Sequence, residues 1–438
     1  MGRTRWDADG KPHRRRAQRR SNRTAAADRG RRPQTHRARR SDTQRGQHGD
    51  SRRRANRVES RSHNPGASSG RVPLRARGHR RRRRGVVESN LRPLSPPDSV
   101  AEEIGAPRVS ILLPFRDAAP TLATCLASIV RQTEPNWECI AVDDGSVDGG
   151  GAQVEAAARN DPRFTLLPLP KSGLVASLNA GLEFCRASLV ARMDADDWMH
   201  RDRLAEQLAL LDADPELSAV GSRVRIFPRS GLSPGRRRYE AWLNELGTPE
   251  SVRNDAYIEC PIAHPSLMVR TRVLREFGYR AMGWPEDYDL VLRLIGAGHS
   301  LAVHPRRLLG WRDSPSRLSR RAPEYALERF TACKAAHLAD GPLQQVDHYL
   351  LWGYGSTGRA LRKALLAHGK SPSHIVEVHP RRLGKRIHGA PVVAPDAIPS
   401  LPRHPLLISV AGFAPRSEIR ETLAKMGFHE GRHFFCVA

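Results

Sequence analysis

The chain has 438 residues, which is long enough for two or three domains with cores of their own. Its formal net charge of +27 suggests a nucleic-acid partner, but that charge is distributed unevenly. Residues 1–100 hold 30 Lys and Arg against 8 Asp and Glu, whereas the remaining chain holds 43 against 38. The basicity therefore belongs to the N-terminal segment, and the rest of the chain is close to neutral.

The cysteines and the hydropathy together favour a soluble protein. The six cysteines form neither a Cys-x-x-Cys pair nor a disulfide framework, which argues against a zinc ribbon and favours a reducing compartment. Apolar runs stay well below the roughly 20 residues of a membrane span, and the N-terminus lacks the apolar stretch of a secretory signal. We expect a cytoplasmic protein, with peripheral contact at the inner face of the membrane as an alternative.

Residues 1–106 are expected to form a disordered tail. The first 100 residues contain no Phe, Tyr, Ile or Cys and are rich in Arg, Gly, Ser and Pro. Such a segment cannot bury enough apolar area to offset its ordering entropy. The run Arg80–Arg84 could bind RNA, DNA or an anionic membrane surface. The alternatives are a solvated tail without a partner, or a reading frame that was opened too far upstream.

Strands and helices alternate in the next hundred residues. Apolar runs predict strands over residues 109–114, 138–142 and 164–167, and a further strand that begins at Leu189. Apolar residues at helical spacing predict helices over residues 121–132 and 174–186. This alternation is typical of a parallel sheet covered by helices, with ligands at the carboxyl ends of the strands.

Two groups of acidic residues fall at such strand ends. Asp143 and Asp144 follow one strand, and Asp194 and Asp196 follow another. Two carboxylates two residues apart project the same way from an extended backbone, and hard oxygen ligands suit Mg²⁺ or Mn²⁺. The alternative for an isolated Asp-x-Asp is a solvated acidic turn.

The following region mixes the two periodicities. We predict a helix over residues 203–212, strands over residues 219–227 and 266–270, and a helix from Pro285 to Gly296. Glu286 and Asp287 lie in the first turn of this last helix. Acids beside the positive end of a helix dipole are also ordinary capping residues, so the pattern alone leaves both roles open.

A helical connector over residues 321–345 leads to another α/β unit. A strand at residues 349–352 is followed by the G-x-G-x-x-G sequence of Gly353, Gly355 and Gly358 and by a helix, and Glu377 lies 19 residues beyond the last glycine. This arrangement is typical of a Rossmann-like fold, in which these four residues would bind a nucleotide. The alternative is that the glycines serve only tight packing between helix and strand.

Several segments resemble, in the same order, those of family 2 glycosyltransferases with the GT-A fold. The matching segments are Val109–Asp117, Ser128–Thr133, Val142–Ser146, Leu178–Gly181, Arg192–Asp197 and Glu286–Leu290. The resemblance implies a nucleotide-sugar-binding domain with a mixed central sheet, a divalent metal (Mg²⁺ or Mn²⁺), and a glycan or lipid-linked acceptor. It also implies an inverting transfer of the sugar to a hydroxyl group, in the synthesis of a surface polysaccharide.

The resemblance implies roles for residues around the donor. Those expected to contact the nucleotide sugar are Pro114, Phe115, Arg116, Asp143, Asp144, Lys171 and Asp194. A carboxylate such as Asp144 can accept a hydrogen bond from the imino N–H of a base, and Lys171 would act as a point charge near the phosphates.

The resemblance also implies the metal ligands and the base. Asp194 and Asp196 match the family's Asp-x-Asp motif, in which Asp194 would bind the ribose and Asp196 the metal, with Asp194 as a further candidate metal ligand. Asp287 matches the general base that takes the proton of the acceptor hydroxyl, with Glu286 as its rival.

Two positions depart from the family's usual pattern. Arg116-Asp117 replaces a frequent aromatic-Asn pair, and Asp313 lies where a histidine is common. Asp313 could lie near the metal or form a loop salt bridge. His264 lies where the family approaches its acceptor, with an ordinary turn histidine as the alternative.

We therefore expect four parts: a tail (1–106), a GT-A domain (107–320), a helical connector (321–345) and a smaller Rossmann-like domain (346–438). The leading hypothesis is a glycosyltransferase. One alternative is a nucleic-acid-associated protein that uses the Arg-rich tail. Another is a nucleotide-binding oxidoreductase or epimerase centred on the Gly353 loop.

Overall fold

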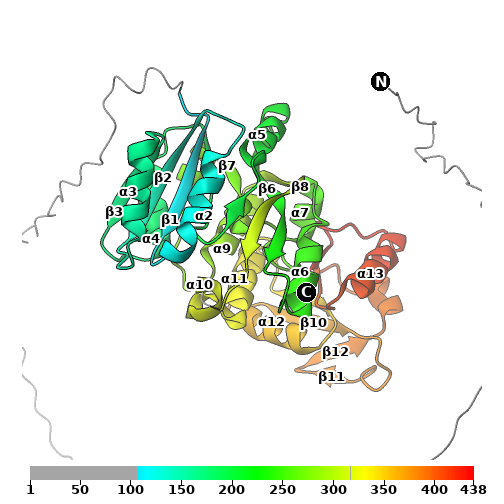
Figure 1. Cartoon of the computed structure of the whole chain (residues 1–438). Helices are drawn as coiled ribbons and strands as arrows, with labels where there is room; N and C mark the ends of the chain where they lie inside the picture. Colours follow the sequence, from blue (N-terminus) through cyan, green and yellow to red (C-terminus); the bar gives the residue numbers. More distant parts are fainter. Residues whose placement is uncertain (1–105, 316) are drawn as a thin grey trace, which may run out of the picture. The chain divides into compact units, whose positions relative to one another are not determined.

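The computed structural model describes residues 106–315 and 317–438 (Figure 1). The predictions for the Arg-rich tail, including the arginine run, lie outside the described residues. The described chain contains an eight-stranded sheet followed by a six-stranded sheet. No described helix combines the length and the apolarity needed to cross a membrane.

The larger sheet is mixed, in agreement with the expected fold class. Its strands follow the order β3-β2-β1-β4-β7-β6-β8-β5. β1 to β4 run parallel to one another, whereas β7 is antiparallel to both of its neighbours and β5 is antiparallel to β8. The strands are β1 (Val109–Phe115), β2 (Trp137–Asp144), β3 (Phe164–Leu169), β4 (Leu189–Arg192), β5 (Trp198–Met199), β6 (Leu217–Phe227), β7 (Met268–Arg270) and β8 (Ser300–Arg312).

Side chains of β1 alternate between two apolar cores, one on each face of the sheet. Ile111 and Leu113 pack with Leu122 of one helix, whereas Leu112 packs with Leu178 of another. This alternation follows from the two-residue period of a strand. The helices of this part are α2 (Ala119–Val130), α3 (Gly150–Asn160), α4 (Leu174–Phe184), α5 (Arg203–Ala213), α6 (Pro234–Leu243), α7 (Pro249–Asp255), α8 (Thr271–Phe277) and α9 (Glu286–Gly296).

A helical segment joins the two sheets. It consists of the short helix α10 (Leu318–Arg321), the 3-10 turn η2 (Pro323–Tyr325) and the longer helix α11 (Leu327–Asp340). α11 packs against α9 of the first part and against α12 (Ser356–Leu366) of the second. The connector is therefore in contact with elements on both sides of it.

The smaller sheet confirms the Rossmann-like fold. Its strands follow the order β11-β12-β10-β9-β13-β14, and all neighbours are parallel except the edge strand β11. Figure 1 draws this sheet in orange to red. Its elements, besides α12, are β9 (His348–Trp352), β10 (Ser371–Val376), β11 (Arg386–Ile387), β12 (Ala390–Val393), η3 (Pro395–Ser400), β13 (Leu406–Ile408), α13 (Phe413–Lys425) and β14 (Phe434–Cys436).

Most predicted elements are present with shifted ends. The structure differs from the predictions at two strands. The strand expected over residues 266–270 begins only at Met268, because His264–Ser266 forms the 3-10 turn η1. The sequence patterns do not predict β8, since three exposed residues, Pro305, Arg306 and Arg307, interrupt its apolar run.

Candidate active site

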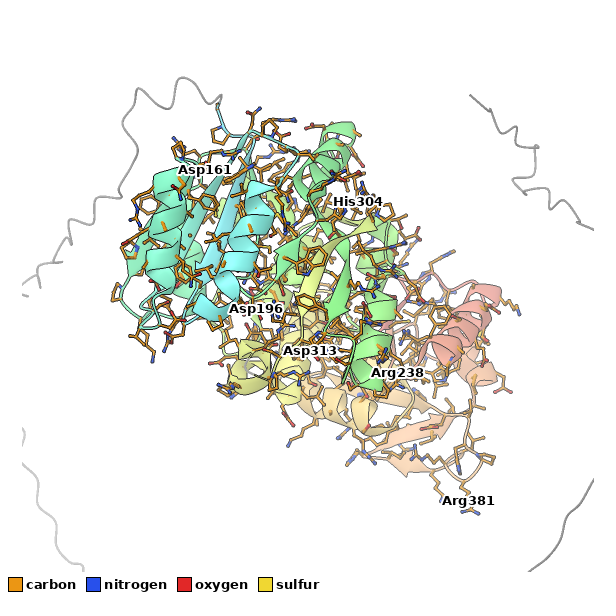
Figure 2. All side chains as sticks on the ribbon, in the orientation of Figure 1. Asp161, Asp196, Arg238, His304, Asp313 and Arg381 are labelled. Atoms are coloured by element: carbon orange, nitrogen blue, oxygen red, sulfur yellow. The ribbon has the colours of Figure 1, made fainter. Side chains whose placement is uncertain are left out.

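Three carboxylates gather after β4, at the carboxyl end of the strand. Asp194, Asp196 and Asp197 each offer an oxygen atom, and these atoms all lie within 4.8 Å of one another. Asp196 is labelled in Figure 2. Asp194 and Asp196 therefore lie together as the sequence predicts. Asp197, which is not among the predicted ligands, completes the group.

The three acids differ in their partners. Arg192, the last residue of β4, forms an ion pair with Asp194. Asp197 accepts a hydrogen bond from the backbone N–H of Arg312 at 2.6 Å through Oδ1. Its other oxygen, Oδ2, is buried without a hydrogen-bond partner among the described residues. A buried carboxylate oxygen without a donor is unfavourable unless a cation or another donor meets it.

Electrostatics in this group favour a bound cation. Burial and the charge of Asp194 raise the pKa of Asp196. Burial raises the pKa of Asp197 even further, with added contributions from Asp194 and Asp196. Burial also opposes ionisation of Asp194, but the charges of Arg192 and Arg317 outweigh it, so that its pKa is lowered. A divalent cation would relieve the repulsion among the three carboxylates.

The second group of acids lies at the start of α9. Glu286 Oε2 accepts a hydrogen bond from the Tyr325 hydroxyl at 2.5 Å, and Glu286 Oε1 lies 3.5 Å from Nδ1 of His264. Nε2 of the same histidine lies 3.0 Å from the Tyr279 hydroxyl. Both oxygens of Glu286 are therefore engaged. Burial would raise the pKa of Glu286, but the contacts with His264 and Tyr325 outweigh it and lower the pKa.

Asp287 is less constrained than its neighbour. Its one hydrogen bond among the described residues comes from the backbone N–H of Tyr288 at 2.7 Å. Burial, and then the negative charge of Glu286, raise the pKa of Asp287 to about 8. The side chain is nevertheless partly accessible to solvent. A carboxyl group with these properties can exchange a proton near neutral pH.

Arg192 and His264 connect the two acidic groups. Burial lowers the pKa of His264, and so does the nearby charge of Arg192. Nδ1 of His264 lies 3.5 Å from Glu286, and a proton on this ring would favour the ionised forms of both Glu286 and Asp194. The fold therefore brings the Asp-x-Asp motif and the start of α9 into one site, as the sequence predicts.

The predicted nucleoside-binding acids hold loops together. Asp144 accepts hydrogen bonds from the backbone N–H groups of Ser172 at 2.6 Å and Gly173 at 2.9 Å, and Asp143 accepts one from Ser146 at 2.8 Å. Burial opposes ionisation of Asp144, but these amide contacts lower its pKa. Asp144 thus joins the loop after β2 to the loop after β3.

The other residues predicted to contact the nucleotide sugar are Pro114, Phe115, Arg116 and Lys171. Pro114 and Phe115 are buried within β1, and Phe115 packs in the core rather than facing solvent. Arg116 is exposed beside them. Lys171 is also exposed, and its backbone passes so close to Gly145 that a Cβ there would lie 2.9 Å from the Lys171 nitrogen.

The departures from the family pattern have direct structural explanations. Asp313, also labelled in Figure 2, forms ion pairs with Arg320 at 2.7 Å and with Arg236 at 3.7 Å, so the salt-bridge alternative is the one observed. His264 is buried against Glu286 and Tyr279, which makes it more than a turn residue.

In the smaller sheet, the residues predicted to bind a nucleotide make packing contacts and hydrogen bonds within the glycine-rich loop and its neighbours. Gly353 has φ 89°, and a Cβ on Gly358 would lie 2.5 Å from the Gly353 carbonyl oxygen. Glu377 Oε1 accepts hydrogen bonds from the Tyr354 N–H at 3.0 Å and from Arg382 at 2.6 Å. Tight packing therefore accounts for Gly358, and the carboxylate of Glu377 already has partners within the chain. Gly355 directly precedes α12, and a Cβ added to it would meet no described atom within 4 Å.

Sequence reasoning misses three residues of the site. Tyr325 reaches Glu286 from the connector, and no local pattern marks it. Arg192 carries a signal, because an arginine that ends a buried apolar strand needs an acidic partner. Asp197 is part of the same acidic run as the predicted pair, but its contact with Arg312 cannot be inferred from spacing.

Comparisons with known proteins identify the family. Residues 110–278 match the family model Glycosyl transferase family 2. The amylovoran biosynthesis glycosyltransferase AmsE of Erwinia amylovora is 30% identical over 215 residues, which cover 49% of this chain and 78% of the relative. The putative glycosyltransferase EpsE of Bacillus subtilis is 28% identical over 242 residues, which cover 53% of this chain and 84% of the relative.

Similar solved structures include S. aureus TarS 1–349 in complex with UDP-GlcNAc, with a TM-score of 0.45 and 16% identity, covering 60% of this chain and 72% of that one. The mannosyltransferase PcManGT from Pyrobaculum calidifontis in complex with GDP-Man and Mn²⁺ has a TM-score of 0.42 and 21% identity, covering 60% and 70%.

The chain belongs to glycosyltransferase family 2. It is a glycosyltransferase that depends on a nucleotide-sugar donor, which favours the leading hypothesis over the nucleic-acid-associated protein and the oxidoreductase or epimerase. The family match ends at residue 278, so the smaller sheet lies outside it.

Proposed function

We propose that the enzyme transfers a sugar with inversion to a hydroxyl group of a glycan or a lipid-linked acceptor, in the synthesis of a surface polysaccharide. The observation that carries this proposal is the cluster of Asp194, Asp196 and Asp197 together with a separate Asp287, whose pKa is raised to about 8 by burial and by Glu286. A single displacement needs both parts: a site for the leaving diphosphate and a base for the attacking hydroxyl.

Asp194, Asp196 and Asp197 would hold a divalent metal, Mg²⁺ or Mn²⁺. The fit is supported by three converging carboxylates and by the buried Asp197 Oδ2, which has no hydrogen-bond partner among the described residues. Oxygen ligands of this type suit either ion. When bound, the metal would supply Lewis-acid stabilisation of the diphosphate. The carboxylates orient the donor, and Arg192 holds Asp194 in place.

Asp287 would be the general base and Glu286 a positioning residue. Glu286 is held by His264 and Tyr325, and its lowered pKa makes it a weak base. Asp287 accepts a single hydrogen bond from the described residues, and its pKa lies near the working range. It would take the hydroxyl proton while the acceptor oxygen attacks the anomeric carbon.

The donor's nucleoside would lie at the carboxyl ends of β1 and β2, between Asp143, Asp144 and the exposed Arg116 and Lys171. Asp144 Oδ2 retains acceptor capacity beside its contact with the backbone. Nucleotide binding by the smaller sheet stays a separate prediction, and the contacts of Glu377 within the chain do not require it.

Thermal-shift measurements with nucleotide sugars and Mn²⁺ would test the donor site in the full-length protein. We expect one donor to raise the melting temperature in the presence of Mn²⁺, and Asp196→Asn to remove most of this shift. Arg238→Gln on the exposed face of α6 serves as a control that should keep the shift. Unaltered sugar transfer by Asp196→Asn would contradict the proposed role of this acid.

A further inference from the structure

An open cavity lies between helices α6 and α7 and helix α13. Its volume of about 350 Å³ is within the usual range for small-molecule sites. The lining includes Trp242 and Glu245 from α6 and the loop after it, Glu250 and Asn254 from α7, and Phe413 from the start of α13. Among the described residues, the lining contains none of the acids proposed for catalysis or metal binding. The cavity is therefore a second candidate site.

Two aromatic side chains give the cavity an apolar surface. Phe413 is 65% exposed, although phenylalanine is among the residues most often buried. Trp242 is half-buried, and its ring centroid lies 5.7 Å from that of Tyr239. Its indole N–H donates to Asp255 Oδ2 at 2.7 Å, so the tryptophan ring is fixed by contacts within the chain. The two rings offer apolar faces on which a ligand can pack.

Three polar side chains of the cavity are available to a ligand. Glu245, Glu250 and Asn254 form no side-chain hydrogen bond or ion pair within the described part of the chain. Both glutamates are exposed, and Asn254 is partly exposed. A carboxylate accepts hydrogen bonds, whereas an amide both accepts and donates them. The cavity therefore suits a ligand with several hydroxyl groups.

The charge of the cavity disfavours a ligand that carries phosphate. Four carboxylates line it against the single cation of Arg420, and they are those of Glu245, Glu250, Asp255 and Glu430. Arg420 is already ion-paired, with Asp255 at 2.5 Å and with Glu430 at 2.8 Å. A nucleotide sugar or a lipid diphosphate would meet uncompensated negative charge here. The ligand is therefore uncharged or cationic.

We propose that this cavity binds an uncharged sugar unit of the acceptor glycan, other than the unit that reacts. This inference rests on the proposed function. A pyranose ring has a face of C–H bonds, which packs on an aromatic ring, and a rim of hydroxyl groups, which bond to carboxylates and amides. A cation would suit the acids and the rings as well, but it has no use for the amide donor of Asn254.

The cavity is connected to the active site along the chain. Asp255 lines the cavity, and the segment that follows it leads to His264, which contacts Glu286. A glycan held at both places gains affinity from the remote unit, because the second contact becomes intramolecular. The cavity would thus favour long acceptors over short ones.

Sugar titrations of the full-length protein, followed by saturation-transfer NMR, test the proposal. The probes are glucose, galactose, mannose and N-acetylglucosamine, with spermidine as the cationic alternative. Phe413→Ala and Asn254→Ala alter opposite walls of the cavity. Val378→Ala is the matched control, because Val378 is 70% exposed in the smaller sheet and does not line the cavity. Circular dichroism checks that each variant is folded.

We expect at least one of the four sugars to bind. Phe413→Ala should weaken its binding about tenfold, because the variant loses the exposed ring. Asn254→Ala should weaken it about threefold or more, because hydrogen bonds to the amide are lost. Val378→Ala should bind the sugar as the unaltered chain does.

The inference would be overturned if none of the four sugars bound, or if spermidine alone bound at Phe413. Unchanged sugar binding in either cavity variant would also overturn it, since the sugar would then not span the two walls. If only the proposed function is wrong, a sugar still binds at Phe413 while the chain transfers none from a nucleotide sugar. If only this inference is wrong, transfer proceeds and Phe413→Ala leaves sugar binding unchanged.

Discussion

Glu286 and Asp287 are adjacent acids with different surroundings. Glu286 is held by a tyrosine and a histidine that come from distant parts of the chain. Asp287 keeps its carboxylate free of side-chain partners among the described residues, and its pKa is raised to about 8 by burial and by Glu286. The contacts of each acid, rather than its position in the motif, are therefore the reason why we propose Asp287 as the base and Glu286 as the positioning residue.

Replacing Glu286 by Gln tests this separation through the pH dependence of the rate. Asp287 accepts a proton only when it is ionised, so kcat should rise with pH as Asp287 deprotonates. Gln at position 286 removes the negative charge that helps to raise the pKa of Asp287. The rising limb of log kcat against pH should then move to lower pH. A limb that stays in place would show that Asp287 is not the titrating group.

At the residue scale, the sequence predicts the acids of the site better than their partners. Asp194, Asp196, Glu286 and Asp287 stand in recognisable local patterns. Tyr325 could not be predicted, because its contact with Glu286 depends on the path of the connector. The same limitation applies to roles that depend on pairing across the fold, such as the contact of Arg312 with Asp197.

Among the elements, α4 shows how closely a helix must approach the sheet that carries the site. Gly181 faces β1 and β2, and a Cβ added there would lie 2.5 Å from Leu112 Cδ1 and 2.6 Å from Val142 Cγ2. Both of these side chains are fully buried. They have little room to move, because protein interiors are close-packed.

Gly181→Ala should therefore lower the free energy of unfolding by about 1–3 kcal/mol, the usual range for overpacking a core. Urea denaturation followed by circular dichroism measures this change. Gly296→Ala, at the end of α9, is a matched control with no atom within 4 Å of the added Cβ. Equal stabilities for the two variants would contradict the close packing of α4 on the sheet.

The strands show where periodicity succeeds and where it fails. β1 and β2 are predictable because each contains a buried apolar run, Ile111–Phe115 in β1 and Cys139–Val142 in β2. The sequence does not predict β8, because three consecutive exposed residues interrupt its apolar pattern. Its last residues include Trp311 and Arg312. β8 is stabilised by pairing with β6 and β5, and such pairing is not visible in a local window.

On the scale of the whole molecule, the smaller sheet contacts a segment that leads into the active site. Arg420 of α13 forms ion pairs with Asp255 at 2.5 Å and with Glu430 at 2.8 Å. Lys334 of α11 donates hydrogen bonds to the carbonyl oxygens of Ile258 at 3.0 Å and Val437 at 2.8 Å. The segment that these contacts hold continues directly to His264.

Arg420→Gln should destabilise the protein by about 3 kcal/mol, because it leaves the largely buried Asp255 and Glu430 without their counter-charge. Thermal and urea unfolding measure the loss. Arg403→Gln, at an exposed loop position, should leave stability unchanged within about 0.5 kcal/mol. If Arg420→Gln were equally neutral, the link between the two sheets would contribute little to stability.

The overall arrangement is predictable in outline. Alternating strands and helices predict an α/β fold, and the glycine-rich loop predicts the second sheet. The order of strands in each sheet and the packing of α11 against α9 depend on contacts between distant residues, so local sequence patterns could not give them.

The most direct test of the central claim is sugar transfer by Asp287→Asn, measured with the donor identified by thermal shift. Asn keeps the size of the side chain but cannot accept the hydroxyl proton as a base. We predict that donor binding stays within about twofold while kcat falls by at least about a hundredfold, the scale of general-base catalysis. Transfer at an undiminished rate, with the donor still bound, would contradict the assignment of Asp287 as the base.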